Sequence, residues 1–234
     1  MEIRDNERLT FHLSEVLAGT RRFENAAQSV SRMILEKGVD KVMRGGKPTY
    51  DFGFFRQGRE HIVGWFGEAN EFVNFVKNAA EGGPSKQRAF VLVGEPGNGK
   101  TFFVEYVCTK YRRFLTHPEN RRYTFEFSGL EKLKVYGNIR VIQSQTFEDP
   151  LILAMNLFET PDESRERFSQ FGFDDRTTDR LWVNYRPLGA CTEYIWNDIR
   201  SHCDGDVQKM LEFIRIVAVP IAHSSGIITG KYSA

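Results

Sequence analysis

The sequence predicts an α/β fold in which a parallel sheet is flanked by helices, with a helical extension at the N-terminus. Two observations predict this class. Short apolar runs alternate along the chain with longer segments of helical periodicity, a pattern typical of sheets covered by helices. One of these runs, 89–93, leads through a glycine-rich loop into an apolar helical segment. With 41% apolar residues in 234, the chain can bury a full core.

Two amphipathic helices are predicted before the glycine-rich loop. Segment 25–38 places Ala26, Ala27, Val30, Met33 and Ile34 on one helical face and ends at Gly38. Segment 68–81 carries a second apolar stripe and ends at Gly82-Gly83-Pro84. The polar stretch 40–49 between them is assigned no element.

The glycine-rich loop is predicted to lie between a buried strand at 89–93 and a helix from Lys100 to about Phe114. Further strands are expected within 122–130, 139–147 and 213–221, where apolar or aromatic side chains recur. Helices are expected after Pro150, at Thr160-Pro161-Asp162-Glu163, where threonine can cap and proline can begin a helix, and around 192–203.

Composition narrows the classes of partner. The chain has 32 basic and 31 acidic residues and a formal charge of +1, so it offers no general electrostatic attraction for nucleic acid or an anionic membrane. Its three cysteines are too few for a disulfide framework. The charged first residues do not resemble a signal peptide. The expectation is a cytoplasmic protein that binds neither nucleic acid nor membrane.

The loop spells Gly94-Glu95-Pro96-Gly97-Asn98-Gly99-Lys100-Thr101, which matches the phosphate-binding pattern Gly-x-x-x-x-Gly-Lys-Thr. Glycines let backbone N–H groups turn around phosphate oxygens, and the start of the following helix adds positive potential. The ammonium of Lys100 is expected to reach the β- and γ-phosphates, and the hydroxyl of Thr101 to ligate Mg²⁺. The sequence therefore predicts a site for a nucleoside triphosphate, in which Lys100 and Thr101 take the catalytic roles.

Phosphoryl transfer usually also needs an acidic residue on a neighbouring strand, to hold the metal and orient water. No apolar run in the chain ends in a clear acid of this kind. The candidates are Glu148-Asp149, Asp174-Asp175 and Glu212, and each is expected to be an ordinary surface carboxylate. The five histidines and three cysteines show no convincing ligand spacing.

Several segments together resemble the N-terminal ATPase domain of the PrkA family, bacterial serine protein kinases with an AAA-type core. These segments are "ENAAQSVSRMI", "GWFGEANEFVNFVKNAAEGG", "FEDPLILAMNLFE" and "CDGDVQKMLEFIRI" followed by "GIITG". The resemblance implies a P-loop NTPase fold of AAA type. It also implies a helical extension over 1–60 and a core over 61–234 that is incomplete at its C-terminus. The apolar box at Trp65, Phe66 and Gly67 would lie near the adenine.

By the same resemblance, the chain would be the ATP-binding module of a PrkA-like serine protein kinase. ATP and Mg²⁺ would be its cofactors, and a protein would be its substrate or partner. The complete protein would hydrolyse ATP or transfer a phosphoryl group to serine, whereas the isolated chain would be weakly active or inactive. The alternative is a regulatory or assembly module that binds nucleotide without turnover. A small-molecule kinase is a third hypothesis, disfavoured because no arginine-rich lid follows the loop. The sequence leaves homo-oligomerisation open.

Overall fold

The computed structural model describes residues 8–59 and 61–220. They belong to two compact units. We call residues 8–23 with 118–220 the sheet unit, and residues 24–59 with 61–117 the loop unit. The boundary predicted at residue 60 lies inside the loop unit.

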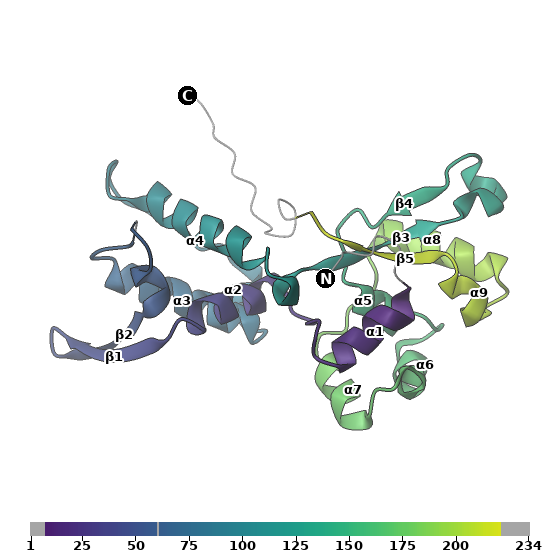
Figure 1. Cartoon of the computed structure of the whole chain (residues 1–234), viewed down its shortest axis with the longest axis horizontal. Helices are drawn as coiled ribbons and strands as arrows, with labels where there is room; N and C mark the ends of the chain where they lie inside the picture. The colour runs from purple at the N-terminus through teal and green to yellow at the C-terminus, as the bar shows by residue number, and fades with distance from the viewer. Residues whose placement is uncertain (1–7, 60, 221–234) are drawn as a thin grey trace. The chain divides into compact units, whose positions relative to one another are not determined.

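The sheet unit is built around a three-stranded antiparallel sheet in the order β4-β3-β5 (Figure 1). The strands are β3 (Tyr123–Ser128), β4 (Val141–Gln143) and β5 (Ile214–Ala218). In the central strand, Phe125 lies opposite Ile216 and Phe127 opposite Ile214. Alternate aromatic residues thus face the core, as strand periodicity requires.

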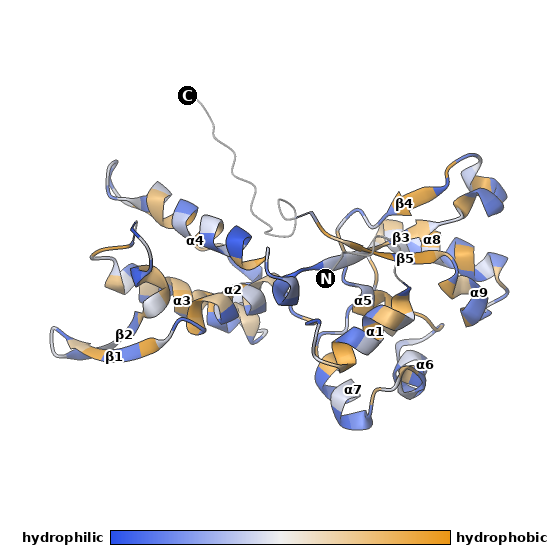
Figure 2. Ribbon diagram, viewed as in Figure 1, coloured by the Kyte–Doolittle hydropathy of each residue, from blue (hydrophilic) through white to orange (hydrophobic). Residues whose placement is uncertain are grey.

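Helices α1 (Leu9–Leu17) and α5 (Pro150–Met155) pack on this sheet. All six residues of α5 are buried. In Figure 2, apolar residues, coloured orange, are visible on the strands of the sheet. Helix α8 (Ala190–His202) contributes Trp196, whose ring stacks on Phe127 with centroids 6.0 Å apart. The remaining helices of the unit are α6 (Pro161–Glu166), α7 (Asp175–Trp182) and α9 (Val207–Leu211).

The loop unit contains three helices and a β-hairpin. Its helices are α2 (Ala26–Leu35), α3 (Phe66–Ala80) and α4 (Lys100–Phe114), and α2 and α3 lie side by side (Figure 1). Helix α2 begins with a capping box, in which Asn25 and Gln28 each bind the other's backbone N–H. The hairpin pairs β1 (Val39–Arg44) with β2 (Lys47–Phe52) through a turn at Gly45-Gly46.

The structure confirms the predicted mixture of helices and strands, but the described strands do not form the predicted parallel sheet. The structure is mixed α/β, as predicted, and the helix predicted over 100–114 is α4. The parallel sheet is not formed in residues 8–59 and 61–220, since every paired strand there is antiparallel. The predicted strand 89–93 is not paired either, and strand pairing, unlike helix formation, depends on a neighbouring segment.

A buried histidine in the sheet unit gives the fold a testable pH dependence. His12 of α1 is 3% exposed, and its Nδ1 lies 2.9 Å from the guanidinium of Arg21. Burial and the Arg21 charge lower the pKa of His12 to about 3, so the ring is neutral in the folded state. In the unfolded chain a histidine titrates near 6.5.

Between about pH 6.5 and 3 the unfolded state therefore binds a proton that the folded state does not. We therefore expect the free energy of unfolding to decrease as the pH is lowered through this window. This group contributes a decrease of at most about 1.4 kcal/mol per pH unit. His12→Gln keeps an acceptor for Arg21 but does not titrate. Urea denaturation of both proteins at pH 7, 6 and 5 should show a steeper loss for the parent, and parallel curves would contradict the prediction.

Candidate phosphate-binding loop

The glycine-rich loop of the loop unit runs from Gly94 to Gly99 and opens helix α4. Gly97 and Gly99 have positive φ angles of 86° and 75°, which glycine adopts without the strain that a Cβ would add. Residues 94–99 are all exposed. The predicted geometry of a tight loop entering a helix is therefore present, and the loop is open to a ligand.

Lys100 closes the loop from the first turn of α4. Its Nζ donates hydrogen bonds to the carbonyl oxygens of Gly94, at 2.7 Å, and Glu95, at 2.6 Å. A Cβ added at Gly94 would lie 3.8 Å from both Lys100 Nζ and Asn98 Nδ2, so the two ends of the loop converge. An ammonium has three donors, and two of them are used here, which leaves one N–H for an anion.

Trp65 lies against the last glycine of the loop. A Cβ added at Gly99 would lie 3.8 Å from the indole of Trp65. The same indole stacks on Phe103 with centroids 5.4 Å apart, and Phe103 stacks on Phe55 at 5.7 Å. The loop therefore rests on a column of three aromatic rings, and Trp65 is the part of the predicted apolar box that borders it.

The other two residues of that box are placed differently. Phe66 begins α3, and its ring lies beneath the guanidinium of Arg44, which is 3.3 Å from the ring centroid. Gly67 is exposed, with no atom within 4 Å of the position that a Cβ would take. Arg44 belongs to β1, so the hairpin, which the sequence prediction missed, covers Phe66.

The segment before the loop alternates between packed and exposed side chains. Phe90 packs against Phe72 and Phe75, each at 5.4 Å, and Leu92 packs against the aromatic core. Val91 and Val93 are 71% and 90% exposed. Within the part of the chain that the structure describes, no backbone hydrogen bond joins 89–93 to another segment. The expected buried strand is thus half covered and carries its apolar β-branched side chains in solvent.

The acidic residues considered as metal ligands belong to the sheet unit. Glu148 is 6% exposed and is not the surface carboxylate that the sequence predicted. Asp149 caps α5 by accepting a hydrogen bond from the N–H of Leu151, and burial raises its pKa to about 6. Asp174 caps α7, Asp175 begins it, and Glu212 follows α9; all three are exposed, as predicted.

Among residues 8–59 and 61–220, no group of three or more histidine, cysteine, aspartate or glutamate side chains could hold a metal ion. Thr101, the predicted magnesium ligand, is exposed on the first turn of α4. In the same described ranges, no helix combines the length and the apolar character needed to cross a membrane.

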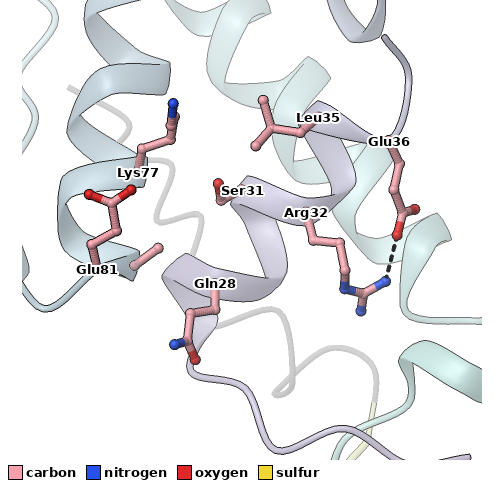
Figure 3. Close-up of a pocket in the computed structure, with 8 residues that line it drawn as sticks. Gln28, Ser31, Arg32, Leu35, Glu36, Lys77 and Glu81 are labelled. Atoms are coloured by element: carbon pink, nitrogen blue, oxygen red, sulfur yellow. Dashed lines mark hydrogen bonds and ion pairs between the residues drawn. The ribbon is translucent and has the colours of Figure 1, made fainter. Parts of the chain in front are cut away.

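A groove of about 450 Å³ lies between α2 and α3 of the loop unit. Figure 3 shows Arg32 of α2 joined by an ion pair of 3.0 Å to Glu36, which follows that helix. Lys77 of α3 and Glu81, which follows α3, lie on the facing side. Two cations and two anions balance each other in this lining, so the groove does not select a ligand by the sign of its charge.

Comparison with known proteins adds no assignment: no family model, no curated protein and no solved structure matches the chain.

Proposed function

We propose that the loop unit binds ATP with Mg²⁺ through residues 94–101. The observation that carries the proposal is the double hydrogen bond from Lys100 Nζ to the carbonyl oxygens of Gly94 and Glu95. It holds the ammonium over an exposed glycine loop with one donor still available. A phosphate oxygen is the acceptor that such a loop and a helix N-terminus favour.

Each residue of the loop has a role in this proposal. The backbone N–H groups of Gly97, Asn98, Gly99 and Lys100 would bind phosphate oxygens, whereas Pro96 has none to offer. Lys100 would offset the negative charge between the β- and γ-phosphates. The hydroxyl of Thr101 would ligate Mg²⁺. Trp65 would limit the space beside Gly99, because its indole rests there. When bound, Mg²⁺ would neutralise part of the phosphate charge. The loop N–H groups, Lys100 and Thr101 would hold the phosphates and the ion in place.

The larger role proposed is that of an AAA-type module of a PrkA-like serine protein kinase, built on a P-loop NTPase core. This part of the proposal rests on the sequence resemblance. In such a protein, ATP hydrolysis or phosphoryl transfer to protein serine would take place at this loop, with a protein as partner or substrate. We place it in the cytoplasm on composition alone.

A second candidate function is nucleotide binding without turnover, as a regulatory or assembly signal. One observation on the sequence favours it for this chain: no apolar run ends in a clear acid that could hold the metal and orient water. The two functions differ in phosphate release. An ATPase or kinase releases or transfers phosphate from bound ATP, whereas a binding module leaves the nucleotide intact.

Lys100→Ala tests the proposal. We expect it to weaken binding of a fluorescent ATP analogue with Mg²⁺ by about a hundredfold, or ~2.7 kcal/mol, because a charge-assisted contact to phosphate is lost. Lys77→Ala is the matched control, since Lys77 is exposed on α3 of the same unit, and it should bind as the parent does. Phosphate release from the same samples distinguishes the two functions. Equal affinity in the parent and Lys100→Ala would defeat the assignment.

A further inference from the structure

A second concave surface of the loop unit lies along α4, and Tyr106, which lines it, also contacts Phe55 of the aromatic column. It is a depression of about 370 Å³ between the helix and the segment Gly58-Arg59. Its helical lining, which recurs every three or four residues and so forms one face, is Phe102, Glu105, Tyr106, Thr109, Lys110 and Arg113.

The charge of this lining is strongly unbalanced. Arg59, Lys110 and Arg113 carry three positive charges against the single carboxylate of Glu105. Within the described part of the chain, no ion pair engages any of the three cations. The groove between α2 and α3 differs in this respect, because its lining has two cations and two anions. An excess of positive charge therefore distinguishes the depression from that groove.

Two cations of the depression differ in how firmly they are held. Lys110 is half-buried and donates to the carbonyl oxygen of Gln57 at 3.3 Å, while its ammonium lies 5.2 Å from the ring centroid of Tyr106. Tyr106 is anchored in turn by its hydroxyl, which donates to Phe54 O at 2.7 Å. Arg113 is exposed, and its guanidinium forms no ion pair within the described part of the chain, so it can turn toward an incoming anion.

The depression also offers an apolar contact and a hydroxyl. The ring of Phe102 is 39% exposed, and Thr109 is exposed between Phe102 and Arg113 along the helix. From Phe102 to Arg113 the helix rises about 16 Å. An extended peptide covers that distance with about five residues. A single phosphate could not contact cations and an aromatic ring spread over this length.

We propose that the depression along α4 binds an acidic segment of a partner protein. The segment is about five residues long, with carboxylates facing Arg59, Lys110 and Arg113 and an apolar side chain against Phe102. The opposite charges of the segment and the depression would attract the segment and orient it along the helix. The contact of its apolar side chain with Phe102 would fix which residue of the segment faces which residue of α4. The proposal does not depend on nucleotide binding, because Lys100 and the loop residues 94–99 are not part of the surface.

The test uses the full chain without nucleotide and a synthetic peptide, Leu-Glu-Asp-Glu-Asp, in calorimetric titration at low salt. We expect binding that weakens when sodium chloride rises from about 0.05 M to 0.5 M, since exposed charges are screened. The peptide with glutamine and asparagine in place of the acids should not bind. Arg59→Glu with Arg113→Glu should reduce the affinity about tenfold or more, because repulsion replaces attraction.

The matched control is Lys41→Glu with Lys77→Glu, which changes the net charge by the same amount at exposed positions of the same unit outside the depression. It should bind the acidic peptide within about twofold of the parent. Equal losses in both double variants would overturn the proposal, since the attraction would then come from net charge alone. Displacement of the peptide by an equal concentration of inorganic phosphate would also overturn it and assign a small-anion site. So would the absence of binding to the parent chain.

Discussion

Glu148→Ala is expected to destabilise the sheet unit by about 3–5 kcal/mol, because it removes the acceptor at the centre of a buried polar cluster. Oε1 of Glu148 accepts from the backbone N–H of Gly189 at 2.7 Å. Oε2 accepts from Ser144 Oγ at 3.0 Å and from Thr192 Oγ1. With alanine at this position, the buried hydroxyls of Ser144 and Thr192 and the partly buried N–H of Gly189 would lose their partner at once.

The cluster links parts of the unit that are distant in sequence. Ser144 follows β4, Gly189 precedes α8, and Thr192 lies in its first turn. The backbone carbonyl of Glu148 also accepts from Thr124 of β3 at 2.9 Å. Glu148 therefore joins the first turn of α8 to the sheet by hydrogen bonds, and both hydroxyl residues that bind its carboxylate are buried.

Urea denaturation followed by far-UV circular dichroism measures the loss. Glu148→Gln, which keeps one oxygen acceptor, should be destabilised by less than the alanine variant. Glu159→Ala is the control, since Glu159 is exposed, and it should change the stability by no more than about 0.5 kcal/mol. A loss below about 1 kcal/mol for Glu148→Ala would show that the three donors find other acceptors or water.

Glu148 also illustrates what the sequence could not predict. Its neighbours along the chain indicate a surface carboxylate before a proline. Its decisive partners, Gly189 and Thr192, lie 41 and 44 residues away. Several helices, in contrast, follow from local periodicity, and the helix predicted from Lys100 to about Phe114 is α4. A helix satisfies its own backbone, whereas a buried carboxylate needs residues that only the tertiary fold brings near.

The strands also show the difference between what local sequence predicts and what depends on tertiary contacts. Alternating Tyr123, Phe125 and Phe127 predicted β3 correctly, but the apolar run 89–93 was predicted as buried and leaves Val91 and Val93 exposed. Periodicity indicates which residues can form a strand, and it does not indicate whether a neighbour is present. The hairpin β1–β2 was missed because its stretch is polar. The pair Gly45-Gly46 was the available signal, since two glycines are a preferred two-residue hairpin turn.

For the loop itself, the sequence predicted which residues take part but not what supports them. The motif identified Gly94 to Thr101, and the structure places their glycines at positive φ and Lys100 across the loop. The support comes from the column formed by Trp65, Phe103 and Phe55. Phe103 lies within the helix predicted from Lys100 to about Phe114. Its contact with Trp65, and through it with Gly99, depends on how α3 and α4 pack.

Phe103→Ala is expected to cost the loop unit about 3–5 kcal/mol, the usual loss for a buried phenylalanine. Phe103 is 2% exposed and contacts three other rings: Trp65 and Phe55 by stacking, and Phe72 edge-on at 5.4 Å. Removing its ring takes away the surface on which the indole rests. The variant should therefore lose stability and, under the proposed function, nucleotide affinity as well, whereas Lys100→Ala should lose affinity with little change in stability.

Adjacent residues of α4 provide the control. Phe102 is 39% exposed, so Phe102→Ala should lower the stability by less than about 1 kcal/mol, because little apolar area leaves the core. Thermal unfolding and nucleotide titration of the three variants Phe102→Ala, Phe103→Ala and Lys100→Ala separate packing from charge. If Phe103→Ala kept full affinity at a temperature where it remains folded, the aromatic column would be a core element without influence on the loop. Loss of affinity in the folded variant would mean that ring packing maintains the loop geometry that Lys100 uses.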